Sequence, residues 1–87
     1  MAVSKIPMSK KIHESSIQAT TGNFGEVNLN MPNTQYIILG AVCDSAGNYL
    51  CIPYIAGTAN AVAVLSLTSL AHVTSKPVTI RFFYIER

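Results

Sequence analysis

Two stretches of the sequence are apolar on both of the faces that an extended chain presents. They are YIILGAVCD, residues 36–44, and YLCIPYIA, residues 49–56. The side chains of a β-strand point alternately to the two faces of its sheet, so strands of this kind are expected to be covered on both sides. Any fold for this chain therefore has to cover two faces of the same strands.

The rest of the chain also has the alternation and the turn residues that are typical of strands. Strands are expected at residues 15–21, 24–31, 36–44, 49–56, 61–70 and 78–85. The sequence GTAN, residues 57–60, is expected to be a turn. The alanines and leucines of 61–70 would also suit a helix, but the neighbouring strands favour a strand there. The pattern predicts an all-β chain, a small antiparallel β-sandwich of jelly-roll-like type.

The sequence DSAG, which begins at Asp44, has Asp and Gly at the positions that a β-turn favours. We therefore expect a hairpin that pairs residues 36–44 with residues 49–56. Cys43 and Cys51 would then share one face of the hairpin, on a diagonal. Two buried free thiols are favoured over a disulfide, because a disulfide has strict distance limits and a cytoplasmic origin disfavours it.

The composition indicates that much of the apolar surface is covered by other molecules. Hydrophobic residues make up 49% of the 87 residues and charged residues only 11%. An average soluble domain has about 25% charged residues, and a single domain this short buries only roughly 60–65% of its surface. We therefore expect the chain to assemble with other copies or with another protein.

Half of the basic residues lie in the first eleven positions, at Lys5, Lys10 and Lys11. We divide the chain into a basic N-terminal arm, residues 1–12, and a β-sandwich domain, residues 13–87. The arm is expected to be solvated or to dock on a partner protein. It has neither aromatic nor arginine clusters, so nucleic acid is not an expected partner.

No segment is expected to enter a membrane. The longest apolar stretch, residues 59–70, contains several polar residues and is shorter than the ~20 residues that a spanning helix needs. Near the N-terminus, the polar sequence HESS stands where a signal peptide would have its apolar core. Synthesis and folding in the cytoplasm are therefore expected.

The residues that usually carry chemistry do not form a recognisable catalytic or metal motif. They are Cys43, Cys51, His13, His72, Glu14, Glu26, Asp44 and Glu86. The cysteines and histidines lack the spacing of a zinc site, and no glycine-rich phosphate loop is present. A pair of acids as in a glycosidase is the enzymatic alternative, which the scattered acids support only weakly. We expect no catalytic residue, no metal and no cofactor.

A binding surface is the remaining candidate. Tyr36, Tyr49 and Tyr54 lie near expected strand ends, beside Asn33, Asn48 and Asn60. A flat ring beside fixed donors and acceptors suits a polar ligand or a sugar. The candidate ligand-binding residues are Asp44, Asn48, Tyr49, Tyr54 and Asn60. The alternative is that these tyrosines pack in a core or in a seam between subunits.

The segments YIILGAVCDSAGNYLCIPYIAG, VAVLSLTSL and KPVTIRFFYIER together resemble the C-terminal head domains of bacteriophage tail fibres and receptor-binding proteins. The resemblance extends over roughly residues 35–85 and consists of strands and short motifs. It implies a trimeric β-sandwich whose closing strand is buried in a sheet, with Phe82, Phe83, Tyr84 and Ile85 at the subunit interface. Fibre heads usually follow a long shaft, whereas only about thirty residues precede the similar region here.

The resemblance further implies a virion protein that is made in the host cytoplasm and binds a host surface receptor, which we expect to be a saccharide. The basic arm would then attach the head to another virion protein. A purely structural virion component, such as a capsid decoration or head-fibre protein without a ligand, is the alternative.

Overall fold

The computed structural model describes residues 11–44 and 48–87, and these residues form six strands and no helix. The strands are β1 (His13–Thr20), β2 (Glu26–Pro32), β3 (Tyr36–Cys43), β4 (Tyr49–Ala56), β5 (Ala59–Ser66) and β6 (Pro77–Glu86). The described part of the chain thus has no helix that could cross a membrane. The prediction of an all-β chain is confirmed, including a strand over the first part of residues 61–70.

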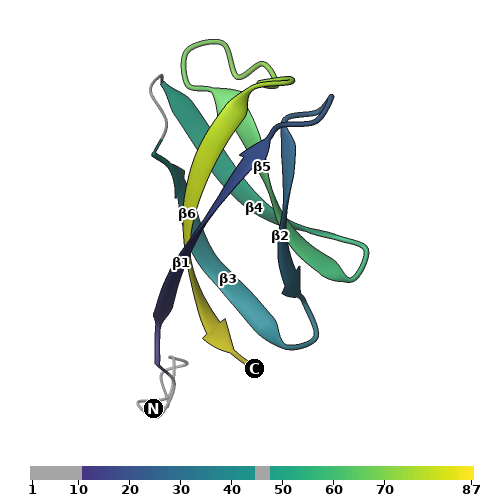
Figure 1. The fold of residues 1–87 in the computed structure, drawn as a ribbon, viewed down its shortest axis with the longest axis vertical. Helices are drawn as coiled ribbons and strands as arrows, with labels where there is room; N and C mark the ends of the chain where they lie inside the picture. Colours follow the sequence, from purple (N-terminus) through teal and green to yellow (C-terminus); the bar gives the residue numbers. More distant parts are fainter. Residues whose placement is uncertain (1–10, 45–47) are drawn as a thin grey trace, which may run out of the picture.

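The strands form two antiparallel sheets of three strands each, in the orders β1-β6-β3 and β2-β5-β4. The sheets pack against each other in a sandwich-like arrangement (Figure 1). β5 and β6 are the central strands, and the other four are edge strands. The aromatic segment near the C-terminus therefore belongs to the middle of a sheet.

The core lies between the two central strands. Val62 and Val64 of β5 and Ile80 of β6 are completely buried, and Phe82 is 2% exposed. The edge strands add Val27 and Leu29 of β2 and Cys51 of β4 to this core. Alternation along each strand thus places one apolar face of each sheet in a shared core.

The expected hairpin between β3 and β4 is wrong. β3 pairs with β6 and β4 pairs with β5, so the connection after Cys43 leads from one sheet to the other. Residues 45–47 of that connection lie outside the described residues. Turn-forming residues reverse the chain locally, but they do not decide whether the flanking strands pair. Here each strand pairs instead with a central strand.

A two-residue hairpin joins β4 to β5 at Gly57 and Thr58. Ala56 pairs with Ala59 across it, and Gly57 has a φ of 65°. A type II′ turn has this positive φ at its first central residue, which is why glycine is favoured there. The predicted turn at residues 57–60 is thus confirmed for its first two residues.

The strands predicted to be apolar on both faces are covered on only one face within the chain. Val42 of β3 is 41% exposed and Ile52 of β4 is 44% exposed, each on the outer face of its sheet. Leu39 of β3 is also exposed, at a bulge that shifts the pairing with β6. The single chain therefore leaves apolar edge-strand surface in contact with solvent.

Candidate functional site

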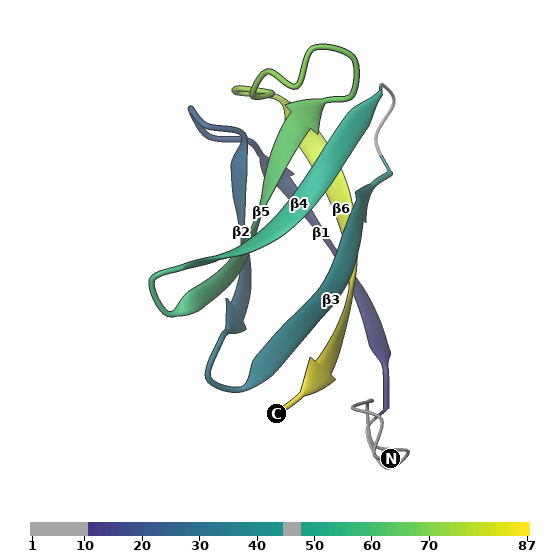
Figure 2. The same cartoon turned by 180° about the vertical axis from the view of Figure 1, so that it is seen from behind.

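β3 and β4 lie next to each other on one side of the molecule, where the two sheets meet (Figure 2). A groove lies between these two strands. Its volume is about 330 Å³, which is at the lower end of the range for small-molecule sites. The lining residues are Tyr36, Ile37, Ile38, Pro53, Tyr54, Ile55, Asn60 and Arg87. We call this the β3/β4 groove.

Two other hollows are larger but lack aromatic rings among their lining residues. One of about 410 Å³ lies beside the end of β1 and the start of β6. The other, of about 490 Å³, lies beside β2 and the β4–β5 turn. Because neither has an aromatic lining residue, the β3/β4 groove is the better candidate for a ligand that binds to rings.

Asn60 fixes the position of the groove wall. Its side chain is buried, and Nδ2 donates hydrogen bonds to the carbonyl oxygens of Met31 and Tyr36, both at 3.2 Å. The bonds connect β5 to the end of β2 and to the start of β3, which belongs to the other sheet. Both amide hydrogens are used in these bonds, so Asn60 ties the groove wall to both sheets.

Tyr36 is held in the groove by a cluster of rings. Its ring meets that of Tyr84 edge-on at 5.4 Å, and His13 stacks on Tyr84 at 5.2 Å. Phe82 is 5.9 Å from Tyr84 on the core side. Because these rings come from β1, β3 and β6, the three strands together orient Tyr36.

Arg87 places a positive charge at the groove. Its Nε donates a 2.6 Å hydrogen bond to the carbonyl oxygen of Asn33, and its backbone N–H donates to the carbonyl oxygen of Gln35 at 2.9 Å. Oδ1 of Asn33 is buried and has no hydrogen-bond partner among the described residues. The groove therefore combines the Tyr36 ring, aliphatic walls, one amide and one guanidinium group. Tyr54 also lines the groove, but its side chain shares the outer face of β4 with Ile52.

The five predicted ligand-binding residues do not come together. Tyr54 and Asn60 line the β3/β4 groove. Tyr49 begins β4, five residues before Tyr54, which is roughly 17 Å away along a strand. Asp44 and Asn48 flank the connection at that opposite end of the molecule.

Each residue of the second group has a structural contact of its own. The carboxylate of Asp44 accepts hydrogen bonds from Nε and Nη2 of Arg81 at 3.0 and 3.3 Å, and these raise the pKa of Arg81. The carbonyl of Asn48 accepts a 2.8 Å hydrogen bond from the backbone N–H of Leu67. Tyr49 packs against the core. These contacts organise the end of the sandwich.

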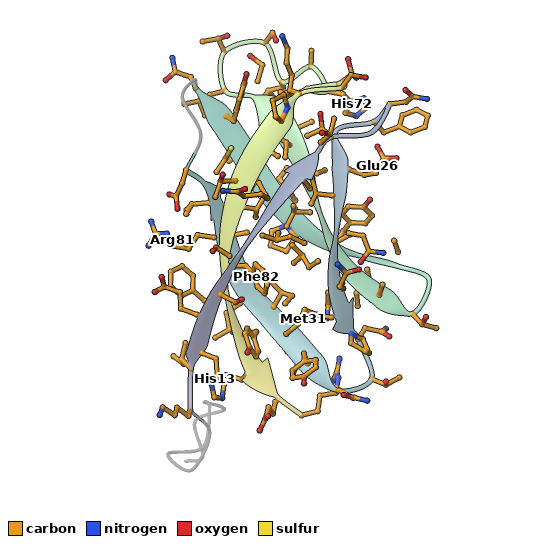
Figure 3. All side chains as sticks on the ribbon, viewed as in Figure 1. His13, Glu26, Met31, His72, Arg81 and Phe82 are labelled. Carbon is orange, nitrogen blue, oxygen red and sulfur yellow. The ribbon has the colours of Figure 1, made fainter. Side chains whose placement is uncertain are left out.

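The four residues expected at a subunit interface lie on both sides of their sheet. Phe82 and Ile85 are buried in the chain itself, and Tyr84 packs against the core. Phe83 points to the outer face, where the Arg81 guanidinium lies 5.8 Å from its ring. Figure 3 shows Arg81 outside the sheet and Phe82 between the sheets. Phe83 is therefore the residue of this group that can offer a ring to a neighbour.

Among the residues predicted to dock on a partner, Lys11 is exposed just before β1. Lys5 and Lys10 lie outside the described residues. No group of three or more metal-ligating side chains is found within residues 11–44 and 48–87.

Glu26 and His72 lie near each other at one end of the sandwich (Figure 3). Oε1 of Glu26 accepts a 2.9 Å hydrogen bond from the backbone N–H of Phe24, and such backbone bonds lower the pKa of Glu26. The Phe24 ring in turn meets His72 edge-on. Glu26 is thus a turn-stabilising carboxylate that stays ionised.

Comparison of the chain with protein-family models, with curated proteins and with solved structures gives no match. A function therefore has to be inferred from the groove, the exposed surface and the strand pattern of the sequence.

Sequence reasoning missed most of the groove. The aliphatic walls carry no signal that separates them from core residues, and Arg87 stands in the sequence without a motif. Tyr36 is recognisable in the sequence as a strand-end tyrosine, but its place in the β3/β4 groove depends on the crossing between the sheets. The sequence places Pro53 near a sheet edge or bulge, and β4 is an edge strand.

Proposed function

We propose that the chain is the head of a bacteriophage fibre or tail tip, and that it binds a host surface saccharide in the β3/β4 groove. The observation that carries the proposal is the Tyr36 ring, held by Tyr84 in the β3/β4 groove, with the Asn60 amide and Arg87 beside it. Sugars present apolar C–H faces and hydroxyl groups. A ring can cover the first, and amide and guanidinium groups can hydrogen-bond the second.

The proposal includes a homotrimer with a jelly-roll-like head. A ring of identical subunits needs two different patches on each copy, because each interface joins unlike surfaces. The described residues place apolar side chains on the outer face of each sheet. On the β1-β6-β3 sheet they are Phe83 and Val42, and on the β2-β5-β4 sheet Leu50, Ile52 and Leu65. If neighbouring subunits cover both of these surfaces, the chain needs few charged residues there, which agrees with its charged fraction of 11%.

In this proposal the virion is the location of the protein, and the basic arm with Lys5, Lys10 and Lys11 attaches it to another virion protein. Removing residues 1–11 is then expected to abolish attachment to the virion while leaving the head folded. Normal assembly of the truncated protein would remove the arm from the proposal.

The purely structural alternative is favoured by one observation. Both hydrogens of the Asn60 amide are already bonded to backbone carbonyls, and Ile37, Ile38, Pro53 and Ile55 make the groove mostly aliphatic. Such a groove can also receive an apolar side chain of a neighbouring virion protein. This alternative has the same assembly but no saccharide ligand.

The test is binding of the labelled, full-length protein to a susceptible bacterial strain and to glycan extracted from its wall. Tyr36→Ala is expected to weaken binding about tenfold, since losing a central aromatic contact typically costs more than about 1 kcal/mol. Asn48→Ala, at the end of β4 away from the groove, is the control and should bind as the wild type does. If neither cells nor glycan bind the wild-type protein, the structural alternative replaces the receptor-binding proposal.

A further inference from the structure

The two cysteines lie on different sheets and face each other across the core. Cys43 is the last residue of β3 and pairs with Ile80 of the central strand β6. Cys51 belongs to β4 and pairs with Val64 of the central strand β5. Ile80 and Val64 are completely buried, and both cysteines pack with them in one cluster.

The two side chains belong to one cluster. Cys51 is buried in the core, Cys43 packs against that core from the other sheet, and both cysteines are free. This arrangement arises because β3 and β4 belong to different sheets. In a hairpin the two side chains would have been diagonal neighbours on one surface of a sheet.

We propose that Cys43 and Cys51 form an intramolecular disulfide that links the two sheets when the protein meets a low-molecular-weight disulfide such as oxidised glutathione. The bond would join edge strands that are otherwise connected only by the segment after Cys43 and by core packing. It would also fix the separation of β3 and β4, which form the walls of the groove. The inference does not depend on the proposed function.

The two cysteines have different roles in the reaction. Burial raises the pKa of the Cys51 thiol to about 12, and the neighbouring Cys43 and Asp44 add to this effect. Cys51 is therefore a poor first nucleophile. Cys43 is half-buried at the end of its strand and is the more accessible of the two.

The reaction proceeds by two thiol–disulfide exchanges. The Cys43 thiolate attacks one sulfur of oxidised glutathione, forms a mixed disulfide and releases one glutathione thiolate. Cys51 then loses its proton to solvent and attacks the Cys43 sulfur, which releases the second glutathione. Overall, two protein thiols are oxidised to one disulfide and one glutathione disulfide is reduced to two glutathione thiols.

The experiment treats the folded, full-length protein with oxidised glutathione at pH 8 and follows its intact mass and its melting temperature. The expected product is a chain lighter by two hydrogens, without bound glutathione and without a disulfide to another chain, in which peptide mapping shows the Cys43–Cys51 link. Closing so short a loop is expected to raise Tm by about 10 °C.

Two variants separate the steps. Cys51→Ala is expected to stop at a mixed disulfide with one glutathione on Cys43, whereas Cys43→Ala is expected to stay unmodified while folded. Circular dichroism checks that each variant is folded. If a variant does not fold, the intact mass and the peptide map of the oxidised wild-type protein still show whether Cys43 and Cys51 are linked.

Three outcomes would overturn the inference. They are a wild-type chain that keeps glutathione on Cys43, one that forms disulfide-linked dimers, and one that does not react when folded although the unfolded chain does.

Discussion

The central strands and the edge strands of this sandwich are built from similar residues but have different surroundings. Ile80 on the central strand β6 is completely buried, whereas Ile52 on the edge strand β4 is 44% exposed. Both lie in segments that are rich in β-branched and aromatic residues. The difference shows that apolar residues on both faces of a strand need not mean that one chain covers both faces.

For the edge strands, the second apolar face is surface that another molecule can cover. Val42 and Ile52 lie on the outer faces of the two sheets, away from the shared core. A small monomer with 11% charged residues has few charges to place on such faces. Residues that face the shared core thus stabilise the single chain, whereas Val42 and Ile52 on the outer faces are available for contact with another molecule.

The largest expected effect is on stability, and it is tested by making the same Ile→Ala substitution on a central strand and on an edge strand. Ile80→Ala is expected to lower the free energy of unfolding by about 2–5 kcal/mol, because it leaves a cavity between the sheets. Ile52→Ala should cost less than about 1 kcal/mol in the monomer, since its side chain is already partly in water. Urea denaturation of both variants under monomeric conditions gives the comparison. Equal losses would contradict the assignment of Ile52 to an outer face.

The next effect concerns the contact between the sheets at the groove. Asn60→Ala removes two hydrogen bonds and leaves the carbonyls of Met31 and Tyr36 without these donors. The expected cost is about 1–3 kcal/mol in the free energy of unfolding. The exposed Asn28, whose Oδ1 accepts a hydrogen bond from the Asn30 backbone N–H at the bulge of β2, provides the control variant Asn28→Ala. Its expected cost is smaller, about 0.5–1 kcal/mol. A neutral Asn60→Ala would show that the amide does not hold the sheets.

Two glycines extend the comparison to the backbone. Gly25 has a φ of 72°, and an added Cβ would collide with the carbonyl oxygen of Val64 on the central strand β5. Gly25→Ala is therefore expected to cost more than about 1 kcal/mol. A Cβ added at Gly40, on the edge strand β3, would meet open space, so Gly40→Ala should leave the Tm of the monomer within a few degrees of the wild type. A large decrease in the Tm of Gly40→Ala would indicate that another molecule already covers β3 at Gly40.

The smallest effect is the pH dependence of the turn that precedes the edge strand β2. The pKa of Glu26 is lowered below 4.5 in the folded chain, chiefly by the backbone hydrogen bond from Phe24. A depressed pKa means that the ionised carboxylate stabilises the fold above pH 4.5, and this contribution is lost as the pH falls through the folded pKa. Glu26→Gln is expected to lose less stability than the wild type between pH 5 and pH 3 in urea titrations. If the free energy of unfolding of Glu26→Gln falls with pH as steeply as that of the wild type, Glu26 does not contribute to the pH dependence.

Much of the fold followed from local sequence signals. The bounds of β4 were predicted as they are found, and Gly57 marked the turn that ends it, because alternation and turn chemistry are local properties. The partner of β3 could not be predicted in this way. Asp44 and the residues after it favour a reversal, but the choice between a hairpin and a crossing depends on β6, which lies more than thirty residues further along the chain.

The candidate site was predictable only in part for the same reason. Tyr54 and Asn60 were selected as a ring and an amide near strand ends, and they line the groove. Asp44, Asn48 and Tyr49 were selected on the same grounds, but they lie at the other end of β4. Arg87 reaches the groove only because β6 is central in its sheet and ends beside β3.

The central claim is that other copies of the chain cover the outer faces of the edge strands. Light scattering on a sizing column measures the native mass directly, for the wild type and for Ile52→Asp. One chain is 9.4 kDa; we predict a wild-type mass near three chains and a variant mass near one chain, with unchanged circular dichroism. A wild-type protein with the mass of a single chain at micromolar concentration would contradict this claim.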